Sequence, residues 1–378
     1  MRETLDPQMT GRAVRRAVAI AATAFLLAIA TASAQPSQQG YAVKIFRVDP
    51  VLFPFVQVYF RTFDQDKQPL VNLNELNVGL MVDGKSYAPE KRQYRLESLR
   101  DRQQAIRSIL VLDASASMAG APFLASLRAA ASFIGSKRPQ DQVAILATSD
   151  TPDGYTLISN FDRDREALLR RLADLKASGK KTRLYDTLGA AMQMAALPPQ
   201  GGGGEQDYIV STAILVFSDG RDEGSALTRD DLNTRISGLA IPIPIYSIAY
   251  TKQSTDYFRN LEALSKNSFG VYYPAGTALD SMQQMVDKIQ NILQSDYVLT
   301  FRSYVDVDGK EHPLKLGIEY PSRSGRMTYE SARFEAVEPP PMGAIQEHVQ
   351  DLAKAIPELP DKDPYFTKRP PAAAAKPE

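Results

Sequence analysis

One short stretch of the sequence places three oxygen-bearing side chains at alternate positions. Asp113, Ser115 and Ser117 come directly after the apolar run Ile106–Leu112. Carboxylate and hydroxyl oxygens are the ligands that a hard cation such as Mg²⁺ prefers, in octahedral coordination that commonly retains water. Serine is also a frequent N-cap residue, so the same stretch could simply cap the helix expected at 122–136. The residue types therefore indicate either part of a metal site or a helix cap.

A second acid, Asp219, follows another apolar run, Tyr208–Phe217. Within the two runs, Ile109–Leu112 and Ala213–Phe217 are wholly apolar, which is typical of strands in a sheet that is covered on both faces. We expect these two most apolar strands to be adjacent and central, so that their carboxyl ends meet at one edge. Ligands bind at that edge in open α/β sheets, where the strand order reverses. The sequence thus predicts that Asp113 and Asp219 lie over the same edge.

The middle of the chain, residues 105–295, alternates strand-like and helix-like segments. Besides the two apolar runs, strands are expected at 142–147, 155–158, 243–250 and 270–273, and helices at 122–136, 163–176, 184–197, 228–239, 256–265 and 278–294. Such alternation is the signature of βαβ units. It predicts a doubly wound, mostly parallel α/β sheet with helices on both faces.

The two flanks of this region, 35–104 and 296–336, are rich in β-branched and aromatic residues. Strands are expected at 41–48, 56–63, 297–304, 313–320 and 326–334, with a hairpin at 80–87 that turns at Asp83-Gly84. Neither flank has enough strands for an independent sheet. We expect the C-terminal flank to pair with the N-terminal one in a small β-sandwich-like domain. The Pro-rich tail, 337–378, is expected to be largely disordered, with one possible helix at 344–356.

The N-terminus carries the pattern of a secretory signal peptide. Arg12, Arg15 and Arg16 come shortly before the apolar run 17–30, and Ala32-Ser-Ala34 supplies a small-residue cleavage site. The run is shorter than the roughly 20 residues that a membrane span requires. We therefore expect cleavage of residues 1–34, no transmembrane span afterwards, and export to the periplasm or the outside of a bacterium.

Composition excludes several kinds of chemistry. The chain has 44 basic and 44 acidic residues, so no strong field favours nucleic acid. It contains no cysteine, which excludes disulfides and thiolate metal sites. Its 2 histidines are His312 and His348, both outside the α/β region. With so few histidines and no cysteine, histidine-based catalysis and a zinc site are not expected.

Three stretches together carry a family resemblance: Asp-x-Ser-x-Ser at 113–117, Thr-Arg-Leu-Tyr-Asp at 182–186 and Phe-Ser-Asp-Gly at 217–220. Over roughly 105–295 the sequence resembles a von Willebrand factor type A domain, in particular those of the bacterial exported subgroup. The resemblance implies a metal-ion-dependent adhesion site. Its hydroxyl ligands would be Ser115, Ser117 and Thr182, and the acids that hold the metal through water would be Asp113 and Asp219.

Such a site implies how the protein would bind a partner. Neutral hydroxyl ligands leave much of the charge of the cation unquenched, so an open coordination position favours an Asp or Glu carboxylate from a protein partner. Mg²⁺ is the expected ion, and the residue types do not distinguish it from Mn²⁺ or Ca²⁺. Lys180 and Lys181 stand where relatives often have glycines. They would either stiffen the loop or add positive charge beside the metal.

Several neighbouring residues have a structural alternative. Thr182 could be the N-cap of the helix at 184–197, a role that does not exclude metal ligation. Tyr185 and Asp186 are expected to support the loop by packing and hydrogen bonding. Asp222 and Glu223 are expected to be solvated charges, with an acidic rim as the alternative.

Three functions from different classes follow. The favoured one is metal-dependent binding of a protein partner in the cell envelope, as in adhesion or complex assembly, without enzymatic activity. The second is an envelope scaffold in which the metal mainly stabilises the fold. The third and least favoured is a metal-dependent hydrolase, which would need a base or nucleophile near the metal.

Overall fold

The computed structural model describes residues 41–359, except 66–67, 88–90, 92, 103, 198–208, 240–241, 251–255 and 323. The signal peptide expected at 1–34 lies outside the described residues. Within the described part, no helix is both long and apolar enough to cross a membrane.

The α/β domain is built on a six-stranded sheet with the strand order β11-β10-β9-β6-β7-β8. Its strands are β6 (Ala105–Leu112), β7 (Gln142–Thr148), β8 (Tyr155–Asp162), β9 (Ile209–Ser218), β10 (Ile245–Tyr250) and β11 (Tyr272–Gly276). Every neighbouring pair is parallel except β7 and β8. The predicted mostly parallel sheet is thus confirmed, with an antiparallel strand at one edge.

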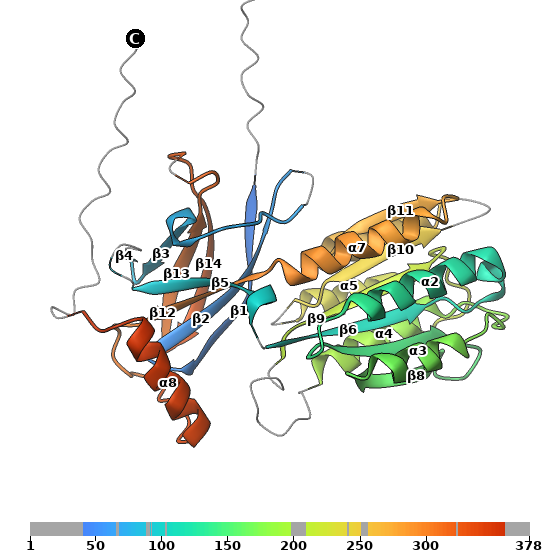
Figure 1. Cartoon of the computed structure of the whole chain (residues 1–378). Helices are drawn as coiled ribbons and strands as arrows, with labels where there is room; N and C mark the ends of the chain where they lie inside the picture. Colours follow the sequence, from blue (N-terminus) through green and yellow to red (C-terminus); the bar gives the residue numbers. More distant parts are fainter. Residues whose placement is uncertain are drawn as a thin grey trace, which may run out of the picture. The chain divides into compact units, whose positions relative to one another are not determined.

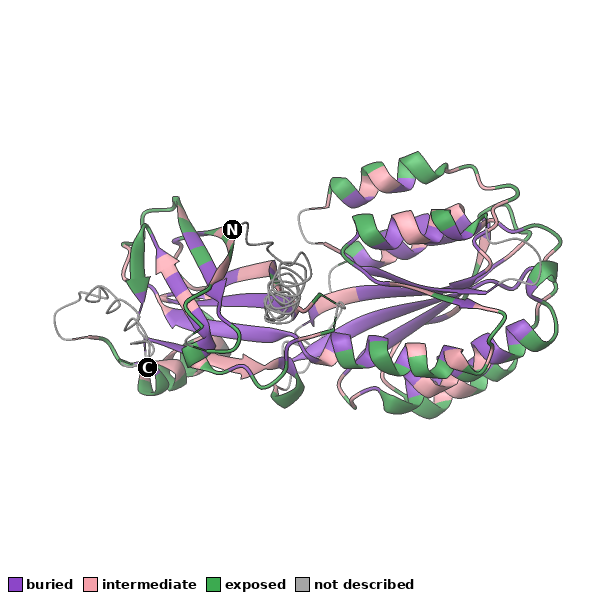
Figure 2. Cartoon of the chain, turned by 90° about the horizontal axis from the view of Figure 1, so that it is seen from above, coloured by how far each residue is buried: buried purple, intermediate pink, exposed green. Residues whose placement is uncertain are grey.

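Helices cover both faces of this sheet (Figure 1). One face packs against α2 (Ala121–Ser136), α3 (Arg165–Ala173) and α7 (Ser281–Gln294), and the other against α4 (Leu184–Ala196), α5 (Arg229–Ser237) and α6 (Phe258–Asn267). Every residue of β6 and β7 is buried, as Figure 2 shows for the strands between the helical layers. This double coverage explains why these strands carry so few polar side chains.

Strands β6 and β9 are neighbours at the centre of the sheet, as the sequence predicted. Leu112 is paired with Phe217, and the amide nitrogen of Asp113 donates a 3.0 Å hydrogen bond to the carbonyl oxygen of Phe217. The chain continues from β6 to β7 on one side and places β9 on the other, so the strand order reverses here. The carboxyl ends of β6 and β9 therefore meet where such sheets bind ligands.

The flanking segments form two four-stranded antiparallel sheets, which we call the β domain. One sheet has the order β1-β2-β12-β5 and the other β14-β13-β3-β4. Their strands are β1 (Ala42–Leu52), β2 (Phe55–Phe63), β3 (Val78–Val82), β4 (Lys85–Tyr87), β5 (Tyr94–Ser98), β12 (Tyr297–Arg302), β13 (Glu311–Ile318) and β14 (Thr328–Glu335). Each sheet combines strands from both flanks, and one apolar cluster contains residues of both sheets. The expected pairing of the flanks is confirmed.

The hairpin predicted at Asp83-Gly84 is also present. Both residues have positive φ angles, 49° and 76°, as the tight turn between β3 and β4 requires.

Part of the tail is ordered. Helix α8 (Gly343–Ala355) is followed by Ile356, which is buried in one cluster with Leu52 and Phe55 of the β domain. This helix corresponds to the one expected at 344–356. Residues 360–378 lie outside the described part.

A buried ion pair joins the β domain to the α/β domain. The guanidinium of Arg61 on β2 donates two 2.5 Å hydrogen bonds to the carboxylate of Asp296, between α7 and β12, and one of 2.6 Å to the hydroxyl of Tyr246 on β10. Burial disfavours the charge on Arg61, but the Asp296 carboxylate outweighs this effect and raises the pKa of Arg61. Burial also raises the pKa of Asp296, whereas the charge and hydrogen bonds of Arg61 lower it.

Candidate metal centre

The Asp113 carboxylate lies at the end of β6 and is only 1% exposed. Its Oδ1 accepts hydrogen bonds from the Ser115 amide at 3.0 Å and the Thr148 hydroxyl at 3.3 Å, and its Oδ2 accepts one from the Ser218 hydroxyl at 2.7 Å. Burial raises the pKa of Asp113 to about 6; the hydrogen bonds from Ser115 and Ser218 lower it, whereas the charge of Asp219 raises it. A cation at this edge would stabilise the ionised form.

Ser117 lies in a short 3₁₀ turn, Ala116–Met118, and Ser115 is the residue directly before this turn. The Ser115 side chain is buried and that of Ser117 is exposed, and their hydroxyl oxygens are 3.0 Å apart. Neither serine caps α2, because that helix begins after Gly120 and has no side-chain cap. The helix-cap alternative is therefore wrong for these residues, and both hydroxyls lie side by side near Asp113.

A separate loop brings Thr182 to the same edge. Gly179 pairs with Ser115 in an isolated parallel bridge: its amide donates to the Ala114 carbonyl at 3.1 Å, and its carbonyl accepts from the Ala116 amide at 2.8 Å. Three residues later, the Thr182 carbonyl accepts a 2.7 Å hydrogen bond from the Glu223 amide. The loop is thus fixed on one side to the serine turn and on the other to the segment after β9.

The hydroxyl of Thr182 is buried but makes no hydrogen bond to any described residue, and the residue is 1% exposed. It does not cap α4, whose N-cap is Arg183, so the capping alternative for Thr182 is wrong. A buried hydroxyl without a partner costs about 1–3 kcal/mol, so native proteins rarely leave one unmatched. An oxygen ligand for a cation is one physical explanation of such an atom.

Asp219 follows β9 and is partly exposed. Its Oδ1 accepts a hydrogen bond from the Arg221 amide at 3.0 Å. The turn that follows requires glycine, because Gly220 has a φ of 78° and a Cβ there would come within 2.6 Å of the Tyr257 carbonyl. The carboxylate is therefore held at the sheet edge by the tight turn behind it.

Two more carboxylates, those of Asp150 and Asp186, fix the loops around the site. Asp150 accepts from the amides of Lys180 and Lys181 at 2.8 and 3.0 Å, and these hydrogen bonds lower its pKa. Asp186 accepts from the amides of Ala226 and Leu227 at 3.0 and 2.9 Å. The expected loop-supporting role of Asp186 is confirmed, and the two lysine amides stiffen the Thr182 loop through Asp150.

Asp222 also has a structural role that the sequence did not reveal. It accepts hydrogen bonds from the Tyr185 amide at 3.1 Å and from the Ser225 hydroxyl at 2.6 Å. It is therefore not a simply solvated charge, and that expectation was wrong. Glu223 is ion-paired with Arg221 at 2.8 Å on a partly exposed surface.

Two hydroxyl residues that contact Asp113 were also missed, Thr148 and Ser218. Thr148 is the last residue of β7 and Ser218 is the last residue of β9, and these two strands flank β6. A polar residue at the end of an otherwise apolar strand is the signal that would have found them, because adjacent parallel strands end at one edge.

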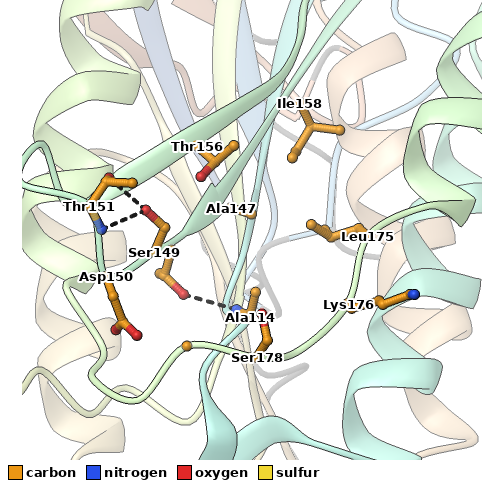
Figure 3. Close-up of a pocket in the computed structure, with 12 residues that line it drawn as sticks. Ala114, Ala147, Ser149, Asp150, Thr151, Thr156, Ile158, Leu175, Lys176 and Ser178 are labelled. Atoms are coloured by element: carbon orange, nitrogen blue, oxygen red, sulfur yellow. Dashed lines mark hydrogen bonds between the residues drawn. The ribbon is translucent and has the colours of Figure 1, made fainter.

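A hollow of about 450 Å³ lies beside the serine turn (Figure 3). Its wall includes Ala114 and Gly179, which hydrogen-bond to each other next to Ser115. The lining also includes Ser149, Asp150 and Thr156, around the end of β7 and the start of β8 (Figure 3). A hollow therefore lies beside the serine turn, although none of the five candidate ligands lines it.

The donor set at this edge suits a hard divalent cation: hydroxyls of Ser115, Ser117 and Thr182, with carboxylates of Asp113 and Asp219. No group of three or more His, Cys, Asp and Glu side chains is placed to hold a metal in the described ranges of 41–359. A cation here would depend on hydroxyl oxygens.

A family comparison agrees with this architecture. The sequence model of the von Willebrand factor type A domain matches residues 108–221, a range that contains all five donor residues. This part of the chain is therefore similar to a von Willebrand factor type A domain. No curated protein matches the sequence.

Solved structures with a similar fold are distant in sequence. The crystal structure of the SpRpn10 VWA domain is 13% identical, with a TM-score of 0.37, and the match covers 48% of this chain and 94% of that chain. The three N-terminal domains of the type V pili tip protein Mfa5 from Porphyromonas gingivalis are 11% identical, with a TM-score of 0.28, covering 78% of this chain and 77% of that chain.

Proposed function

We propose that this protein is an exported, non-enzymatic binding protein that holds a divalent cation, Mg²⁺, at the edge of its von Willebrand factor type A domain. Asp113, Ser115, Ser117, Thr182 and Asp219 supply the protein oxygens. The cation accepts an Asp or Glu carboxylate of a protein partner, in adhesion or complex assembly in the bacterial cell envelope.

The observation that carries this proposal is the buried hydroxyl of Thr182. It has no hydrogen-bond partner among the described residues, although the loop that carries it is tied to the serine turn. The buried carboxylate of Asp113 lies at the same edge, and a cation would stabilise both groups. Because three of the five donors are neutral, the bound cation keeps charge with which to attract an acidic ligand.

Export follows from the arginines, the apolar run and the Ala32-Ser-Ala34 site at the N-terminus. Catalysis is not part of the proposal. Both histidines lie outside the α/β domain and the chain has no cysteine, so the usual bases and nucleophiles do not accompany the site.

The test is titration calorimetry with Mg²⁺, followed by affinity capture from envelope extract with and without chelator. Wild type should bind Mg²⁺ and capture a partner only in its presence, whereas Asp219→Ala should do neither. Thr156→Ala is a matched control for Thr182→Ala, because Thr156 is an exposed threonine at the same edge. If Thr182→Ala binds Mg²⁺ like Thr156→Ala, the ligand set is wrong.

A structural role of the metal is the second candidate, because Asp113 and Thr182 are almost fully buried and a cation there would stabilise the fold. This role predicts that chelation lowers the melting temperature but leaves partner capture intact at low temperature. The binding role predicts loss of capture in chelator even while circular dichroism reports a folded chain.

A further inference from the structure

The loop that carries Thr182 is strongly basic. Residues 176–183 contain Lys176, Lys180, Lys181 and Arg183 and no acidic residue. The loop is fixed beside the serine turn through Gly179. Its positive charge is therefore held next to the proposed metal rather than spread over a mobile segment.

The basic side chains of this loop make no ion pair with an acid of the described chain, although several carboxylates fix the loops around the site. The Arg183 guanidinium donates to two backbone carbonyls, those of Thr151 and Pro152, at 3.3 and 2.8 Å. Asp150 contacts the loop through the backbone amides of Lys180 and Lys181, not through their ammonium groups. The lysine ammonium groups of the loop are therefore not neutralised by a direct ion pair within the described chain.

The two adjacent lysines project their ammonium groups outward. Both side chains are exposed, and neither makes an ion pair or a hydrogen bond with another residue of the described chain. The stem of Lys181 runs beside Gly224, since a Cβ built on that glycine would lie 3.6 Å from Lys181 Cδ. The side chain of Lys181 therefore lies beside the segment that follows Asp219.

We propose that the partner presents a short acidic peptide segment with two carboxylates, one that ligates the metal and a second that is bound by Lys180 and Lys181. This inference rests on the proposed function, because it assumes the metal-bound carboxylate. It adds a second recognition point with charge complementary to the basic loop. Ion pairs at such an exposed rim mainly affect association rate and salt dependence.

The experiment pans the mature chain against a phage-displayed library of random short peptides in Mg²⁺, with elution by chelator. Wild type should enrich peptides that contain two acidic residues at a preferred spacing. The variant Lys180→Ser/Lys181→Ser keeps the backbone amides that bind Asp150, and it should enrich peptides with a single acidic residue. Lys310→Ser/Lys315→Ser, on the exposed side of β13 and its preceding turn, changes the net charge equally and should behave as wild type.

A synthetic peptide from the wild-type selection then gives a double-mutant cycle. At low ionic strength, the lysine double variant should bind this peptide about three- to tenfold more weakly than wild type. Changing the second acid of the peptide to its amide should weaken binding to wild type equally and abolish the difference between the proteins. At physiological ionic strength the difference should shrink.

The outcomes separate this inference from the proposed function. Chelator-eluted peptides with one acid and no second acidic position would overturn the two-carboxylate proposal and leave metal-dependent binding standing. No chelator-eluted peptides from wild type would overturn both. The peptide arm uses the unaltered protein, so it decides the question even if the lysine variant folds poorly.

Discussion

The hydroxyl of Ser218 donates a 2.7 Å hydrogen bond to Oδ2 of Asp113, across 105 residues of sequence. The contact exists because β6 and β9 are adjacent and in register, so that the residues after Leu112 and Phe217 face each other. Ser218 also accepts a hydrogen bond from the Gly220 amide at 3.0 Å. One hydroxyl thus links the buried acid of one strand to the turn that carries Asp219.

Ser218→Ala should destabilise the protein by about 2 kcal/mol, because a hydrogen bond to a buried carboxylate is lost and the Gly220 amide loses its acceptor. Urea unfolding in chelator measures this effect. Ser178→Ala is the control, since Ser178 is an exposed serine near the same edge. Equal unfolding midpoints for the two variants would mean that the Ser218 hydroxyl contributes no stability.

Thr182→Val should have opposite effects with and without metal. Valine has nearly the shape of threonine but no buried unpaired hydroxyl, so the metal-free protein should become about 1 kcal/mol more stable. The stabilisation that Mg²⁺ gives to wild type should disappear, because an oxygen ligand is lost. Thermal unfolding in chelator and in Mg²⁺ tests both parts, and a variant that Mg²⁺ still stabilises fully would refute ligation by Thr182.

Arg61→Met should cost about 3–5 kcal/mol of stability, because it leaves the buried Asp296 carboxylate without its counter-charge. The double variant Arg61→Met/Asp296→Leu should recover most of that loss, since two apolar side chains then replace the ion pair. Urea unfolding of the two variants gives the comparison. If Arg61→Met unfolds like wild type, the pair is unimportant for stability.

His312 should make the stability of the β domain depend on pH. Partial burial lowers the pKa of His312, but its ring nitrogens lie 2.9 and 3.1 Å from the carboxylates of Asp83 and Asp308, and these contacts raise the pKa above its ordinary value. The resulting stabilisation is fully present below the unfolded pKa of about 6.5 and is lost as pH rises through the folded pKa.

Proton NMR titration of the His312 ring and urea unfolding from about pH 5 to about pH 9 measure these two quantities. Asp83→Asn/Asp308→Asn should lower the pKa of His312 and flatten the loss of stability at rising pH. His312→Gln should remove the dependence. A His312 pKa that does not change in the double variant would show that these carboxylates do not set it.

The central part of the site could be predicted because it depends on strand order and strand ends. The apolar runs of β6 and β9 indicated central strands, and their adjacency alone places Asp113 and Asp219 at one edge. Only the family resemblance supplied Thr182, because its loop is positioned by the pairing of Gly179 with Ser115, and nothing in local residue spacing reveals that pairing.

Long-range contacts of individual side chains could not be predicted. Asp222 is fixed by the amide of Tyr185, and Arg61 by a carboxylate 235 residues away. In the tail, the sequence indicated a helix at 344–356 but not that Ile356 is buried in the β domain together with Leu52. In each case the role of a residue depends on which other residue of the chain it contacts, and its type alone does not reveal that residue.

The point where the chain leaves the β domain lies beside the point where it returns. Ser98 at the end of β5 is paired with Tyr297 at the start of β12, and the Leu99 amide donates to the Asp296 carbonyl at 2.8 Å. An insertion with adjoining ends can be exchanged or lengthened without altering the sheet that carries it. The α/β domain is therefore an insertion between two neighbouring strands of the β domain, β5 and β12, and a different domain could be inserted there without altering the two β sheets.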